Sequence, residues 1–245
     1  MAASWPASLL GLAAGALLLA GYVRGGPGWV LGFVALLPWL WLLDRQRSFA
    51  GTLLAAYAMT LAFTLAGFHW FGFAIGRFTQ LGPAAGLALL LLLAPLLQPQ
   101  LLAFALLRRA VRQRLGPLAG ALAGAAAWVG CEWLLLKPLG DSLGHGLYPS
   151  ALLRQGAELG GVAGLTLLLL LVNEALHAAL ARRSAGPRAL AVPLALALLP
   201  PLLLAAYGQA VLGRATASAE KPLRMGLIQA NIADLEARQI GRAHV

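Results

Sequence analysis

Charge is scarce in this chain. Only 11% of its 245 residues are charged, whereas 60% are hydrophobic. A soluble domain is usually about 45–50% apolar and about 25% charged, so a soluble fold of this length would have too little charge to cover its apolar surface. The composition excludes a soluble globular domain and favours a protein that spans a lipid bilayer.

Acidic residues and cysteine are also scarce. The chain has 8 acidic and 18 basic residues, with a formal net charge of +10. The basic residues lie in short clusters between apolar runs, without an RNA-binding motif or a basic recognition helix, so we expect contact with membrane lipid and not with nucleic acid. A single cysteine cannot form an internal disulfide, and Cys131 lies inside an apolar run. We expect it to be a buried thiol and not a nucleophile.

The signatures of soluble enzymes are absent as well. The sequence contains no P-loop, no G-x-S-x-G, no H-E-x-x-H and no Cys/His cluster with metal-ligand spacing. We therefore expect this chain to contain no catalytic residue, no metal and no cofactor.

Seven long apolar runs fill the chain instead. About 20 apolar residues in a helix span a bilayer core, and open strands would leave backbone groups unpaired in hydrocarbon. Each run therefore predicts a transmembrane helix, at residues 7–23, 28–43, 49–73, 82–107, 117–136, 158–181 and 188–212. The predicted fold class is an all-α polytopic membrane protein with a transmembrane domain over residues 1–213.

Prolines interrupt two of these runs. Pro95 and Pro99 lie in the fourth run, and Pro193 and the pair Pro200-Pro201 lie in the seventh. Because proline removes a helix hydrogen bond, we expect kinks or short broken segments there. Residues 137–156 are too polar and broken to span, and we expect an interfacial segment on the outer leaflet.

Lysine and arginine predict the orientation of the helices. If the N-terminus is cytoplasmic, the inner loops hold nine basic residues, which are Arg45, Arg47, Arg108, Arg109, Arg112, Arg114, Arg182, Arg183 and Arg188. The outer loops then hold four, which are Arg24, Arg77, Lys137 and Arg154. Cytoplasmic loops carry the excess of these residues, so we expect the N-terminus inside and everything after Leu212 outside.

Polar side chains inside the apolar runs are candidates for function, because a charged group at mid-bilayer costs about 2.5–3.5 kcal/mol on insertion scales. For lipid-facing or domain-docking roles we select His69, Trp70, Glu132, Trp133, His145 and Asn173. For Glu132, a structural hydrogen bond and a functional role are both open. The tryptophans equally fit an interfacial belt, and Asn173 fits an interhelical hydrogen bond.

Most of these candidates come near the outer surface in the predicted orientation. We expect them to form a polar patch with an aromatic rim, together with Lys137, Asp141 and Glu158. Glu174 and His177 are expected near the inner headgroups, where a charge costs little.

The sequence changes character after Gly213. Residues 214–222 form a polar linker, and residues 223–232 have the pattern of a short strand that leads into a turn. A strand needs partners, so we expect residues 223–239 to be the start of a further domain that is missing here. Residues 240–245, Ile-Gly-Arg-Ala-His-Val, match a translation of a common sequencing adapter, and we expect a non-native tail.

Four segments in register resemble the membrane part of apolipoprotein N-acyltransferase. They are Phe68-His69-Trp70, Trp128 with Glu132-Trp133, Gly161-Val162-Ala163-Gly164-Leu165-Thr166 running to Val172-Asn173, and residues 227–232, which resemble the first strand of a nitrilase-like domain. The chain departs from the family at Leu135, where an arginine is usual, and at residues 140–143, where G-x-P-W is usual.

The resemblance implies chemistry that lies outside this chain. The family transfers a fatty acyl group from a phospholipid donor to the diacylglyceryl-cysteine of a bacterial lipoprotein, through a cysteine thioester. A Glu-Lys-Cys triad in an extracytoplasmic nitrilase-like domain does this chemistry, and Cys131, Glu132 and Lys137 do not match its members. The resemblance thus implies an inactive fragment in the bacterial inner membrane, whose helices form a lipid-accessible platform.

Two other functions stay open from the residues alone. A small secondary transporter would use Glu132, Asn173 and the kinked fourth and seventh runs as a midplane path. A noncatalytic membrane scaffold is the third hypothesis.

Overall fold

The computed structural model describes residues 5–135, 140–217 and 225–226. The chain divides into two units, residues 1–212 and residues 213–245. Lys137, the predicted tail and nearly all of the predicted strand lie outside the described residues. The first unit contains the candidate sites and every helix except the last residues of the final one.

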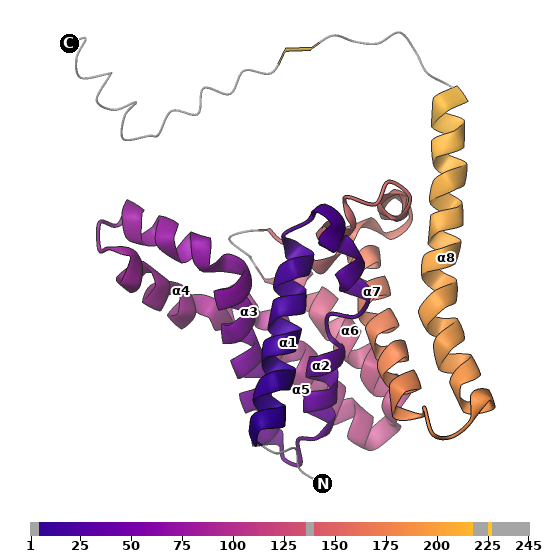
Figure 1. The fold of residues 1–245 in the computed structure, drawn as a ribbon, viewed down its shortest axis with the longest axis horizontal. Helices are drawn as coiled ribbons and strands as arrows, with labels where there is room; N and C mark the ends of the chain where they lie inside the picture. The colour runs from indigo at the N-terminus through magenta and orange to yellow at the C-terminus, as the bar shows by residue number, and fades with distance from the viewer. Residues whose placement is uncertain (1–4, 136–139, 218–224, 227–245) are drawn as a thin grey trace. The chain divides into compact units, whose positions relative to one another are not determined.

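Every regular element among the described residues is a helix (Figure 1). In chain order they are α1 (Trp5–Val23), η1 (Gly26–Phe33), α2 (Leu37–Asp44), α3 (Phe49–Phe78), α4 (Pro83–Leu97), α5 (Pro99–Leu115), α6 (Pro117–Leu134), η2 (Leu143–Leu147), η3 (Leu153–Gly156), α7 (Ala157–Ala181) and α8 (Pro187–Ala217). The elements marked η are 3₁₀-helices. The predicted all-helical class is confirmed for these residues.

The dipeptide Gly-Pro starts three of the long helices. Gly82, Gly116 and Gly186 have φ values of 85°, 90° and 90°, and each precedes the proline that begins α4, α6 or α8. Proline suits the first helical position because its fixed φ is helical and its missing N–H would be unpaired there. Glycine supplies the left-handed backbone that turns the chain into the helix.

Fewer helices meet the length and hydropathy expected of a membrane span than the seven that the sequence predicts. Five segments are long and apolar enough to cross a bilayer, and a bent pair of helices makes a sixth. The five are Trp5–Val23, Gly26–Asp44, Phe49–Phe78, Leu153–Ala181 and Pro187–Arg214. Helix α6, the predicted fifth span, is not among them, since glycines, tryptophans and Glu132 lower its hydropathy.

Proline affects the two interrupted runs differently. The fourth run breaks at Gln98 into α4 and α5, which meet at a bend of 44°. In contrast, α8 runs as one helix through its three prolines, so the seventh run is not divided into short segments. An unpredicted break occurs in α7, where Gly160 and Gly161 have non-helical backbone angles. The second run is also broken, because the 3₁₀-helix η1 precedes a short α2.

Aromatic rings fill the centre of the bundle. Trp39 of α2 stacks on Phe104 of α5 with ring centroids 5.6 Å apart, and Phe104 meets Trp128 of α6 edge-on at 5.9 Å. All three side chains are buried. These contacts fix α2, α5 and α6 around one core, and α4 lies against α3 (Figure 1).

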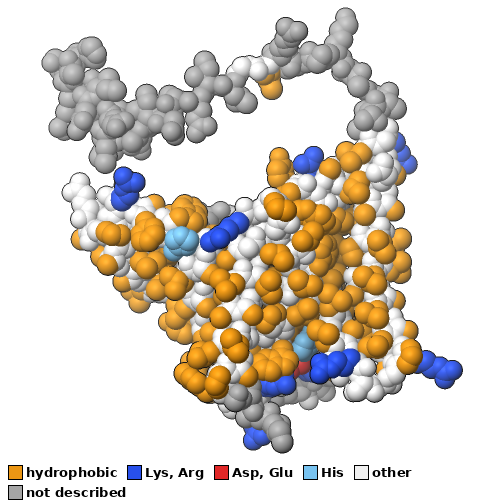
Figure 2. All heavy atoms as spheres, in the orientation of Figure 1, with side chains coloured by type: hydrophobic (Ala, Val, Ile, Leu, Met, Phe, Trp, Pro, Cys, Tyr) orange, Lys and Arg blue, Asp and Glu red, His pale blue; other side chains and the backbone are white. Residues whose placement is uncertain are grey.

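The loops that carry most of the arginines meet at one end of the bundle. Arg109 of α5 donates hydrogen bonds to the carbonyl oxygens of Gln46 and Arg47, each at 2.8 Å. Figure 2 shows an apolar band over the helices, with Lys and Arg side chains gathered beyond both of its edges. This is the pattern of a membrane protein, in which charged groups lie at the bilayer surfaces.

Candidate functional site

A cleft lies at the other end of the bundle. It has a volume of about 510 Å³ and is formed by the last turn of α6, residues 140–142 and the first turns of α7. Its polar lining includes Glu132, Asp141 and Ser142, and its apolar lining includes Trp133 and Val162. Among these residues the sequence predicts Glu132 and Trp133 as functional candidates, with Asp141 beside them.

Three donors hold the carboxylate of Glu132. The indole Nε1 of Trp128 donates to Oε1 at 2.8 Å, and the Ser142 hydroxyl donates to Oε2 at 2.7 Å. The backbone N–H of Leu143 adds a longer bond to Oε1 at 3.4 Å. Trp128 reaches Glu132 because residues four apart lie on the same face of a helix. The network fixes the carboxylate at the wall of the cleft.

Ser142 also connects this network to α7. Its hydroxyl lies 2.8 Å from the hydroxyl of Thr166, which accepts the N–H of Gly144 at 2.9 Å. A Cβ atom on Gly144 would lie 2.4 Å from the carbonyl oxygen of Val162, so only glycine permits this close approach. Residues 142–144 are therefore packed closely against α7 and hydrogen-bonded to it.

His145 has a local role in this segment. Its Nδ1 accepts the backbone N–H of Ser142 at 3.1 Å and completes the cap of η2. It is exposed and does not line the cleft.

The break between α4 and α5 also contacts the cleft. Gln98 is buried, and its side-chain amide donates to Asp141 Oδ2 at 3.2 Å. Gln100 in turn donates to Gln98 Oε1 at 2.6 Å. A chain of polar groups therefore leads from the cleft into the bundle at the point where the fourth run bends.

Two predicted members of the patch lie elsewhere. His69 and Trp70 are on α3, where their rings contact Phe73 and Phe71, and they do not line the cleft. Trp70 and Trp133 are both strongly exposed. The cleft therefore contains Glu132, Trp133 and Asp141 of the expected patch, while His69 and Trp70 lie outside it.

Asn173 lies deep in the bundle and away from the cleft. It is fully buried, and its Oδ1 accepts the N–H of Leu36 at 2.9 Å. Its Nδ2 donates to the carbonyl oxygens of Gly32 and Leu169, each at 2.8 Å. The side chain thus supplies partners for backbone groups at the break between η1 and α2.

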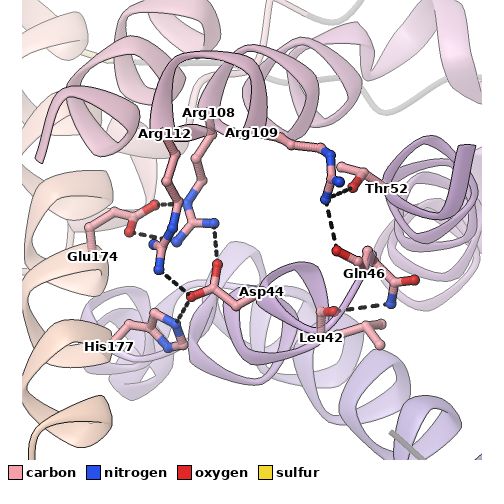
Figure 3. Close-up of polar contacts among 9 residues, drawn as sticks. All are labelled: Leu42, Asp44, Gln46, Thr52, Arg108, Arg109, Arg112, Glu174 and His177. Atoms are coloured by element: carbon pink, nitrogen blue, oxygen red, sulfur yellow. Dashed lines mark hydrogen bonds and ion pairs between the residues drawn. The ribbon is translucent and has the colours of Figure 1, made fainter. Parts of the chain in front are cut away.

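Sequence reasoning missed a buried ion cluster at the arginine-rich end (Figure 3). Arg108 is 3% exposed, donates to Asp44 at 2.6 Å and forms a two-pronged pair with Glu174, with Nη2 to Oε2 at 3.0 Å. Asp44 also binds His177 at 2.9 Å and Arg112 at 3.1 Å. Glu174, which was expected near the inner headgroups, lies at this arginine-rich end, where it is buried and pairs with Arg108.

The cluster could not be found from spacing. Arg108 is 64 positions from Asp44 and 66 from Glu174. The one sequence signal is a carboxylate in an apolar run that also contains Asn173, because such a group needs a partner. With two carboxylates facing two guanidinium groups, the arrangement suits a structural ion cluster.

Metal binding finds no support in the part of the chain that the structure describes. No group of three or more His, Cys, Asp or Glu side chains is placed there to hold an ion.

A family model described as the apolipoprotein N-acyltransferase N-terminal domain matches residues 14–175. The match starts within α1, ends within α7 and includes every residue that lines the cleft. No curated protein and no solved structure matches the chain.

Proposed function

The chain belongs to the apolipoprotein N-acyltransferase N-terminal domain family, and on this premise we propose that it is the membrane part of a lipoprotein acyltransferase. The complete enzyme would transfer a fatty acyl chain from a phospholipid to the N-terminal diacylglyceryl-cysteine of a bacterial lipoprotein. The observation that carries the proposal is the family match, which spans the cleft and its whole hydrogen-bond network.

The proposed topology has seven spans and a cytoplasmic N-terminus in the bacterial inner membrane. Helix α6 would be the seventh span, since it contacts α5 and α7 inside the bundle. The nine arginines of the predicted inner loops support this orientation, because Arg109 and the Asp44 cluster bring those loops to one end. The cleft then faces the periplasm.

The cleft is proposed as the surface that receives substrate headgroups below the catalytic domain. Glu132 is held by three donors, so it would present a fixed negative charge and would not act as a mobile base. Trp133 is 79% exposed beside it and suits an interfacial position, where its indole ring is amphipathic. The Glu-Lys-Cys triad would come from a nitrilase-like domain.

Adding a nitrilase-like domain to these residues tests the proposal. The chain would be expressed in a strain depleted of its own acyltransferase, alone and fused after residue 239 to a nitrilase-like domain of the family. N-acylation of a lipoprotein would be read from the mass of its N-terminal peptide. We expect transfer by the fusion alone, and none by a fusion whose triad cysteine is alanine. Transfer by the 245-residue chain alone would refute the missing-triad proposal.

Glu132→Ala in the fusion tests the role of the cleft. We expect slower transfer at equal protein level, because the network that shapes the cleft wall is lost. The matched control is His177→Ala at the opposite end, which removes a partly exposed contact to Asp44. Equal loss in both variants would show a general folding defect instead.

Cysteine labelling tests the orientation. In a Cys131→Ser background, single cysteines would replace Tyr148 near the cleft or Ala185 in the arginine-rich loop, since both positions are exposed. A membrane-impermeant maleimide should label Cys at position 148 in intact spheroplasts, and position 185 only after lysis. The reversed pattern would invert the proposed topology.

The transporter hypothesis receives little support from the geometry. Its midplane path needs Asn173 to be accessible. Asn173 is fully buried and bonded to three backbone groups.

A further inference from the structure

A second groove lies between α7 and α8. It has a volume of about 400 Å³, and its lining is almost wholly apolar. Gly160 and Gly164 of α7 form part of one wall, and Leu203 and Leu204 of α8 form part of the other. The groove differs in chemistry from the cleft at Glu132.

Backbone geometry keeps this groove open. A Cβ atom placed on Gly160 or Gly164 would have no other heavy atom within 4 Å. Helix α8 instead meets the segment before α7, where Leu204 lies over Gly156 of η3 and Gly208 lies against the carbonyl of Leu152. Beyond this contact the groove continues between α7 and α8, and no side chain fills it.

The groove is continuous with the lipid-facing surface. Helix α8 is the most exposed of the candidate spans, because only 11% of its most apolar 18-residue stretch is buried. Leu203 is itself 61% exposed, so the channel opens directly onto the outer face of α8. An apolar channel at this depth does not hold water, because water needs polar partners. An unfilled gap would also lose the dispersion contacts of its walls.

The groove is short enough to lie within one lipid leaflet. Its α8 wall runs from Pro200 to Tyr207, which is roughly 10 Å at about 1.5 Å per residue. The hydrocarbon core of a bilayer is about 30 Å thick, so one leaflet contributes about 15 Å. The polar groups come at one end, where the Tyr207 hydroxyl donates to Glu158 Oε2 at 3.0 Å. This pair marks the level of the headgroups.

We propose that this groove is a binding site for one acyl chain of a phospholipid in the leaflet on the cleft side. The chain would lie against the bare backbone of Gly160 and Gly164, with its headgroup end near Glu158 and Tyr207. Residues 160–164 separate this groove from the cleft, because Val162 and Ala163 line the cleft. The site needs no acyl transfer, so the proposal stands independently of the proposed enzyme.

Photo-crosslinking tests the site in the 245-residue chain. The protein would be reconstituted in vesicles of phosphatidylethanolamine and phosphatidylglycerol that contain a trace of phosphatidylcholine with a diazirine in its acyl chain. After illumination, mass spectrometry of peptides locates the adducts. We expect enrichment at the groove walls, in residues 156–168 and 200–207, over the rest of the lipid-facing surface. Uniform labelling of the exposed helices would overturn the proposal.

Two matched pairs of variants separate the groove from general exposure. Gly164→Leu fills the channel from α7, and Gly130→Leu adds the same side chain on α6, where a Cβ also meets nothing within 4 Å. Leu203→Trp fills it from α8, and Leu202→Trp changes a neighbour that is 64% exposed and outside the lining. We expect each filling variant to reduce groove adducts several-fold and each control to leave them unchanged. Unchanged adducts in both filling variants would refute the site.

Discussion

Replacing Arg108 by methionine should lower the free energy of unfolding more than any other single arginine substitution. The side chain is 3% exposed and is the only described partner of the Glu174 carboxylate, which is 7% exposed. Removing one member of a buried ion pair costs about 3–5 kcal/mol, because the other charge stays buried without compensation. Asp44 keeps Arg112 and His177, so most of this loss should come from Glu174.

A second substitution should rescue most of the loss. In Arg108→Met with Glu174→Leu no orphaned charge remains, and apolar replacement of a buried pair is often neutral, so we expect stability within about 1–2 kcal/mol of the original chain. The exposed Arg114 on the same helix is the matched control, and Arg114→Met should change stability by about 0.5 kcal/mol or less.

The assay is equilibrium unfolding by sodium dodecyl sulfate in maltoside micelles, followed by circular dichroism. A double variant as unstable as Arg108→Met alone would refute the reasoning, because the cost would then not arise from the uncompensated carboxylate. A loss below about 1 kcal/mol in the single variant would equally contradict a buried, charged pair.

Three further changes test other parts of the fold. Asn173→Leu should cost about 2–4 kcal/mol in the same titration, because it leaves buried backbone groups unpaired, whereas a neutral result would mean that they find other partners. Gly86→Leu should separate α3 from α4, since its Cβ would lie 2.3 Å from the Gly72 carbonyl oxygen, and a cysteine crosslink between the two helices should fall sharply. Ser142→Ala should cost about 1–3 kcal/mol, because it removes a donor from Glu132 and the acceptor of the Thr166 hydroxyl, and retention of full stability would show that the network is dispensable.

The site was only partly predictable from the sequence. Glu132 was selected because a carboxylate in an apolar run needs a reason, and it does line the cleft. Its partner Ser142 carries no such signal, since a serine in a loop is ordinary. His69 and Trp70 were grouped with it by depth alone, and depth does not specify which side of the bundle a residue faces.

Local chemistry determined the helices. An apolar run must form a helix in lipid to pair its own backbone groups, and Gly-Pro starts that helix wherever it occurs. The fold class, most of the helix bounds and the break at Gln98 therefore follow from short stretches of sequence.

Only the tertiary structure decided which polar groups meet. Arg108 finds Glu174 across 66 positions, and Asn173 finds Gly32 across 141. A helix in a bilayer is apolar on nearly all sides, so its sequence has no polar face to show which side packs inward. The side that packs inward is determined by the close approach of particular glycines and by the pairing of particular charges. Both kinds of contact exist only once the helices are together.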